Sequence, residues 1–190
     1  MGPCGTEKPM QVVGGMPTVE RVVRSIAESG AVDRVLVTVS DNTPETGEHL
    51  GSMGVETLHT SGTDFVKDLH AALAALESDY VLVCSSDLPF LGPGHVSDLA
   101  AFFRPEMESA VAVVPRETVE GIGSEPSYTV ESGGKPYAFS GISIIDRRKT
   151  LAGVYLNEEY LVVEDEMLAF NINTQEDLGL AREIWALRNP

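Results

Sequence analysis

Apolar and polar positions alternate along the chain in blocks that predict strands and helices in turn. Four short apolar runs rich in β-branched side chains predict strands: residues 34–39, 55–58, 80–84 and 110–114. Apolar residues three and four positions apart predict helices between them, the first from Pro17 to a stop at Gly30. Short loops between such elements produce right-handed crossovers. We therefore expect an α/β fold with a doubly wound, mostly parallel sheet, in a single domain of residues 1–190.

The second half of the chain departs from this alternation. Residues 115–135 contain several glycines, prolines and charges, and predict a long loop or lid. Residues 137–145 then predict a strand interrupted at Ser140-Gly141, and residues 161–163 a short extended piece. A last helix is expected after Thr174.

The chain is organised around residues 79–91. Tyr80 to Cys84 predict a strand buried on both faces, and Ser85-Ser86-Asp87 follow it at once. Ligands of open α/β sheets bind at the carboxyl ends of the strands. Asp87 is therefore placed to hold a hard divalent cation against phosphate oxygens. The alternative is that Asp87 only caps the turn that follows.

Composition limits the classes of partner. The 190 residues carry a formal net charge of −16, which repels nucleic acid and anionic membranes, so neither is an expected partner. No apolar stretch approaches the roughly 20 residues needed to cross a bilayer, and the first residues lack the apolar run of a signal peptide. We expect a cytoplasmic protein without membrane insertion. Cys84 is expected in a strand and Cys4 in a Gly/Pro-rich segment, so no disulfide framework is expected.

Four polar clusters fall at predicted strand ends or in loops. They are Lys8, residues 60–64, residues 85–87 and residues 171–174. The loops that follow parallel strands line one edge of a sheet, so these clusters are expected to converge. The four histidines have no metal-ligand spacing with cysteine or with one another, and a zinc site is not expected.

The ordered set of short motifs resembles a known family. The motifs are Met1-Gly2 with Glu7-Lys8-Pro9, Ser40-Asp-Asn-Thr-Pro44, Thr60-Ser-Gly62 with Asp68-Leu69, Ser85-Ser-Asp-Leu88, Ser140-Gly-Ile142, and Phe170-Asn-Ile-Asn-Thr174 with Asp177-Leu178. In this order the chain resembles the nucleotidyltransferases of the molybdenum-cofactor guanylyltransferase type. Among them it is most similar to the archaeal GTP:adenosylcobinamide-phosphate guanylyltransferases of cobalamin (vitamin B12) biosynthesis.

The resemblance implies a Rossmann-like nucleotidyltransferase fold and a reaction. A phosphate oxygen of adenosylcobinamide phosphate would attack the α-phosphorus of GTP, with Mg²⁺ as cofactor and pyrophosphate as leaving group. That nucleophile is already anionic, so no general base is required, and catalysis reduces to positioning and charge neutralisation. The expected partners are the small molecules GTP and adenosylcobinamide phosphate, and a homodimer is one assembly open to the chain.

The resemblance also implies roles for single residues. Lys8 would contact the triphosphate, Gly2 and Ser86 would bind the nucleotide, and Asp87 would hold Mg²⁺. Thr60, Ser61 and Gly62 would lie near the base and ribose. Asn171 and Asn173 would face the site from its far side. Plainer readings stay open: an exposed lysine at position 8, a turn with an N-cap at 60–64, and a helix cap at 173–174.

One departure from the family pattern concerns the start of the sequence. The family begins with an apolar strand in the middle of the sheet, followed by a glycine-rich loop that ends in Arg-Met-Gly. Here the sequence begins at Met1-Gly2 of that signature, so the fold is expected without its first strand. We expect the codons upstream of Met1 to encode that strand, the loop and the arginine, and their inclusion to raise stability and GTP affinity.

Other functions remain open at this stage. The same scaffold could transfer GMP or CMP to another phosphorylated acceptor, such as molybdopterin or phospholactate. The chain could also be a non-catalytic, nucleotide-binding remnant, because the phosphate loop is incomplete in this sequence.

Overall fold

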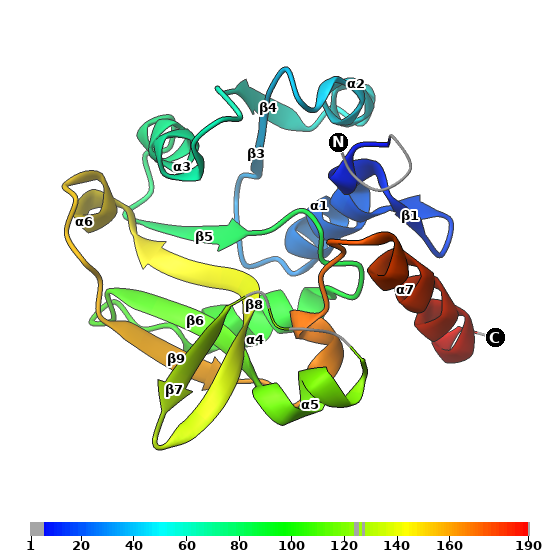
Figure 1. The fold of residues 1–190 in the computed structure, drawn as a ribbon. Helices are drawn as coiled ribbons and strands as arrows, with labels where there is room; N and C mark the ends of the chain where they lie inside the picture. Colours follow the sequence, from blue (N-terminus) through cyan, green and yellow to red (C-terminus); the bar gives the residue numbers. More distant parts are fainter. Residues whose placement is uncertain (1–5, 124–125, 127, 190) are drawn as a thin grey trace.

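The computed structural model describes residues 6–123, 126 and 128–189, and shows helices arranged around a mixed sheet (Figure 1). This confirms the expected α/β class. The helices are α1 (Thr18–Glu28), α2 (Pro44–Ser52), α3 (Phe65–Ala74), α4 (Pro93–Phe102), α5 (Arg116–Gly121), α6 (Arg147–Leu151) and α7 (Gln175–Arg188), with the short 3-10 helices η2 (Lys8–Met10) and η3 (Glu166–Ala169). Within these described ranges, no helix is both long and apolar enough to span a bilayer.

The strands form one main sheet and two small pairs. The main sheet has the neighbour order β5 (Tyr80–Cys84), β8 (Lys135–Asp146), β6 (Ser109–Pro115) and β9 (Glu158–Val162), with β7 (Thr129–Ser132) paired to β8. The pairs are β3 (Leu36–Val39) with β4 (Glu56–His59), which is parallel, and β1 (Val12–Val13) with β2 (Met16–Pro17), which is antiparallel.

Strand β8 runs against its neighbours. It pairs antiparallel with both β5 and β6, whereas β9 pairs parallel with β6. Strands β5, β6 and β9 therefore run in one direction and β8 in the other. The sequence does not predict this reversal, because β8 is entered through a hairpin from β7 and not through a crossover helix. The expectation of a long loop or lid at residues 115–135 is also wrong in part, since α5 and β7 lie within this range.

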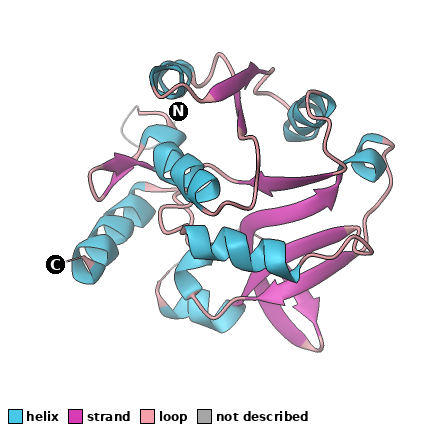
Figure 2. Ribbon diagram, turned by 180° about the vertical axis from the view of Figure 1, so that it is seen from behind, coloured by secondary structure: helices cyan, strands magenta, loops and turns pink. Residues whose placement is uncertain are grey.

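One face of β8 packs on helices. Its alternate side chains Ala138, Ser140, Ile142 and Ile144 are buried. The apolar members of this set join a core cluster with residues of α1 and α4. Figure 2 shows α4 across this side of the sheet, with α1 beside it. The predicted apolar stripe of α1, from Val19 to Ile26, is confirmed as buried.

The interruption expected in β8 is a bulge inside a continuous strand. Ala112 of β6 lies opposite residues 140–142, because the register shifts between Val111 and Val113. Gly141 has φ +85°, a backbone conformation that L side chains rarely adopt. The carbonyl of Gly141 accepts a hydrogen bond from the Ser85 amide at 2.9 Å, so the bulge is tied to the loop after β5.

Strand β5 is less buried than predicted. All five of its residues are half-buried, because the edge that faces β3 borders a cleft of about 1000 Å³. Strands β3 and β5 both line the cleft, together with side chains of α1, α3 and α4. Within the described ranges no strand lies between β3 and β5, which form parts of separate sheets. The other edge of β5 pairs with β8.

The open cleft predicts unequal costs for truncating apolar side chains in neighbouring strands. Ile142→Ala should lower the free energy of unfolding by about 2–5 kcal/mol, because Ile142 is 1% exposed and its removal leaves a cavity. Leu82→Ala should cost less than about 2 kcal/mol, because Leu82 is half-buried and borders the cleft. Urea unfolding of both variants measures the difference. Equal costs would mean that the cleft is closed in solution.

Candidate functional site

Two predicted site residues that are far apart in the sequence meet in the structure. Lys8 Nζ donates a hydrogen bond to Asn173 Oδ1 at 3.2 Å. Lys8 begins the short helix η2, and Asn173 lies just before α7. The expected convergence of these two loops is therefore seen directly, and the interaction fixes one position of the Lys8 ammonium.

Asp87 lies beside this pair. Its backbone carbonyl accepts a hydrogen bond from the Ile172 amide at 3.2 Å, which joins the loop after β5 to the segment before α7. Partial burial raises the pKa of the Asp87 carboxyl, while its own backbone amide and the Lys8 ammonium oppose that rise. We call Lys8, Asp87 and Asn173 the Asp87 cluster.

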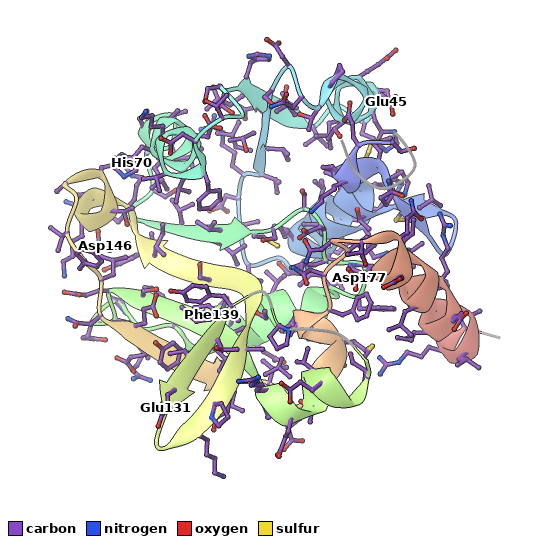
Figure 3. The ribbon with its side chains drawn as sticks, viewed as in Figure 1. Glu45, His70, Glu131, Phe139, Asp146 and Asp177 are labelled. Atoms are coloured by element: carbon purple, nitrogen blue, oxygen red, sulfur yellow. The ribbon has the colours of Figure 1, made fainter. Side chains whose placement is uncertain are left out.

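The segment before α7 is held by Asp177. Its carboxylate accepts hydrogen bonds from the amides of Asn173 and Thr174 at 3.0 and 2.8 Å, and from Thr174 Oγ1 at 2.9 Å. Thr174 in turn caps the helix by accepting from the Asp177 amide at 3.1 Å. Figure 3 shows Asp177 at the start of α7. The cap thus uses the Asn173 backbone and leaves its side chain facing Lys8.

Asp68 holds the 60–63 loop through hydrogen bonds from that loop to its carboxylate, as Asp177 does for residues 173–174. Its carboxylate accepts from the amide and hydroxyl of Ser61 at 3.0 and 2.9 Å, and from the Gly62 amide at 2.9 Å. Asp64 caps α3, as the sequence predicts. Sequence reasoning gave neither Asp68 nor Asp177 a role, although both belong to the quoted motifs. The available signal was an acidic residue in the first turn of the helix that follows each polar loop.

Gly62 fits its position for steric reasons. It has φ +66°, and a Cβ there would lie 2.3 Å from Ser40 Oγ. Its carbonyl accepts a hydrogen bond from Asn42 Nδ2 at 3.1 Å. The loops that follow β3 and β4 are therefore packed directly against each other, with no space for a larger residue at position 62.

The cleft between β3 and β5 borders both the Asp87 cluster and the 60–63 loop held by Asp68. Asp68 lines the cleft, as do Ser86 and Asp87. The structure thus places the Asp87 cluster at the end of β5, and Thr60, Ser61 and Gly62 at the end of β4. Gly2 lies outside the described residues.

The carboxylates near the cleft could hold only a cation that also has ligands from outside the protein. Within the described ranges there is no group of three or more His, Cys, Asp or Glu side chains that could hold a metal ion. Mg²⁺ is commonly bound through one or two carboxylates together with phosphate oxygens and water. A single half-buried carboxylate, whose pKa is raised by burial, fits that pattern because a bound cation would stabilise its charge.

Comparisons with known proteins identify similar sequences and folds. The family model of the MobA-like NTP transferase domain matches residues 1–166. The chain is 28% identical to 2-C-methyl-D-erythritol 4-phosphate cytidylyltransferase of Rhodococcus opacus (strain B4), over 95% of this chain and 88% of that protein. Its fold is similar to a CMP:2-keto-3-deoxy-manno-octonic acid synthetase complexed with CTP, with a TM-score of 0.74 and 16% identity over 98% of this chain and 96% of the other. It is also similar to 4-diphosphocytidyl-2C-methyl-D-erythritol synthase of Anaerococcus prevotii, with a TM-score of 0.71 and 14% identity over 97% and 92% of the two chains.

The raised pKa of Asp87 predicts how stability depends on pH. Because folding favours the protonated carboxyl, the ionised form costs folding free energy above the folded-state pKa, and the cost is relieved as the pH falls through it. Asp87→Asn should therefore raise the free energy of unfolding at pH 7–8. The gain should vanish towards the ordinary aspartate pKa of about 3.9. Urea unfolding over this pH range tests it, and a less stable variant at pH 8 would contradict it.

Proposed function

Because the chain belongs to the family of MobA-like NTP transferase domains, it is a nucleotidyltransferase, and we propose that it transfers GMP from GTP to adenosylcobinamide phosphate. An oxygen of the acceptor phosphate attacks the α-phosphorus of GTP. The new oxygen–phosphorus bond forms as the bond between the α-phosphorus and the bridging oxygen breaks, and pyrophosphate leaves. The acceptor oxygen is already anionic, so no proton has to be removed.

The observation that carries the proposal is the Asp87 cluster. Lys8 supplies a positive charge for the triphosphate, and its hydrogen bond to Asn173 holds that charge in place. Asp87 would hold Mg²⁺, which when bound neutralises charge on the phosphates. Positioning and charge neutralisation of this kind are the main contributions to phosphate transfer.

We assign the base and ribose of the nucleotide to the wall of the cleft opposite the Asp87 cluster. Thr60, Ser61 and Gly62 are small residues, and small residues allow close approach of a ligand to the backbone. The Ser61 and Gly62 amides are already bonded to Asp68, so the loop would bind the nucleoside as a preformed surface. Preformed surfaces lose less conformational entropy on binding.

A second candidate is cytidylyl transfer. The relatives from Rhodococcus opacus and Anaerococcus prevotii carry cytidylyl-transfer names, and another solved structure is complexed with CTP. In this case the same cluster would bind CTP, and CMP would pass to a different phosphorylated or acidic acceptor.

Nucleotide preference separates the two candidates. We expect GTP, with Mg²⁺, to bind more tightly than ATP, CTP or UTP in titration calorimetry. Pyrophosphate release should then require adenosylcobinamide phosphate. Tighter binding of CTP would favour the second candidate, and equal binding of all four nucleotides would count against both.

Substitutions in the Asp87 cluster test the assignment of roles. Lys8→Met should weaken GTP binding about 10- to 100-fold, the usual range for losing a hydrogen bond to a charged group. Asp87→Asn should reduce transfer by about 10²-fold or more. Lys135→Met is the matched control, because Lys135 is exposed at the start of β8, outside the cleft. Wild-type turnover of Asp87→Asn would exclude the metal role.

A further inference from the structure

A second cavity lies on the face of the main sheet that turns away from α4. Its volume is about 540 Å³, within the about 300–1,000 Å³ typical of small-molecule sites. Because side chains alternate along a strand, Phe139, Ser143 and Ile145 of β8 point to this face and line the cavity. Figure 3 labels two of its lining residues, His70 on α3 and Phe139 on β8. We call this cavity the β8 bowl.

Large apolar side chains are exposed around the β8 bowl. Phe65, at the start of α3, is 76% exposed, and Val154 and Tyr155, in the loop after α6, are 50% and 98% exposed. All three line the cavity, although they come from two separate segments. Exposed apolar groups gathered at one opening are typical of a binding surface.

The β8 bowl adjoins the candidate active site. Phe65, Val83, Cys84 and Ser85 line both the bowl and the cleft between β3 and β5. Ser85 comes two residues before Asp87, and the bulge at Gly141 is bonded to its amide. The bowl therefore borders the end of β5, where the phosphates of the nucleotide are assigned.

The lining of the bowl selects against a strongly polar occupant. Its lining residues include no lysine or arginine within the described part of the chain, and their one carboxylate, Glu158, accepts a hydrogen bond from Tyr160 at 2.8 Å. An acidic or polyhydroxylated body would lose hydrogen bonds to water here without gaining cationic partners. A ring system that is mainly apolar would instead cover the exposed aromatic side chains of Phe65 and Tyr155.

We propose that the β8 bowl binds the acceptor of nucleotidyl transfer, and that this acceptor joins its phosphate to a large apolar ring body. The inference rests on the proposed function, since it assumes transfer to a phosphate oxygen. The ring body packs on Phe139, Ile145 and Tyr155, and the phosphate extends past Ser85. Its anionic oxygen forms the bond to the α-phosphorus as the bond to pyrophosphate breaks.

The test uses two phosphate monoesters as probes, 2-naphthyl phosphate and glycerol 3-phosphate. Naphthyl fluorescence should report binding of the first, and glycerol 3-phosphate should compete weakly. The double variant Val154→Ala/Tyr155→Ala should weaken 2-naphthyl phosphate binding about 10-fold or more, because it removes two apolar contact surfaces that line the bowl but not the cleft. Both residues are exposed, so the fold should be retained. Leu187→Ala is the control, since Leu187 on α7 is 82% exposed and lies outside both cavities.

The outcomes separate the inference from the proposed function. Equal or tighter binding of glycerol 3-phosphate would overturn the apolar class of acceptor, and an unchanged affinity in the double variant would overturn the location. Sedimentation equilibrium measures self-association. If the protein self-associates, the double variant abolishes this, and no naphthyl binding is seen, the bowl is instead an interface between copies of the chain. Naphthyl binding by a protein that binds no nucleoside triphosphate would sink the proposed function and leave the apolar site in place. The double variant should bind GTP with unchanged affinity.

Discussion

The antiparallel pairing of β8 with both β5 and β6 is the interaction on which the rest of the molecule depends. Without it, β5 would have no strand partner among the described elements, since its other edge faces the cleft. The same ladder buries one row of β8 side chains against α4 and turns the other row towards the bowl. Its bulge is hydrogen-bonded to Ser85. A single strand thus determines where the core, the Asp87 end of the cleft and the second cavity lie.

Local features of the fold could be predicted from sequence because their causes are local. The apolar stripe of α1, the Asp64 cap and the strand at residues 80–84 all follow from spacing and capping chemistry. The reversed direction of β8 could not be predicted, because it depends on pairing between segments about 60 residues apart in the chain. The burial of β5 was overestimated for a related reason. An apolar run shows that a strand can be buried, but not whether a neighbour covers it.

The candidate site was predictable in outline only. The rule that loops after parallel strands line one edge of a sheet predicted that Lys8, Asp87 and Asn173 lie in one region. The Lys8–Asn173 hydrogen bond agrees with this. The supporting carboxylates of Asp68 and Asp177 were missed, because an acidic residue in the first turn of a helix is common and usually only stabilises the helix. In this protein each one fixes the backbone of a loop that precedes its own helix. Their effect on a ligand is therefore indirect, through the geometry of the loop that they hold.

The open cleft has a consequence for behaviour in concentrated solution. Among the described residues, the edges of β3 and β5 that border it have no strand partner, and unpaired edges promote intermolecular β-sheet growth. The formal net charge of −16 opposes this, because copies of the chain repel one another. At an ionic strength of about 1 M the Debye length falls to about 3 Å, and this repulsion is screened. Colloidal stability of the protein therefore depends on low salt more than it would for a sheet with covered edges.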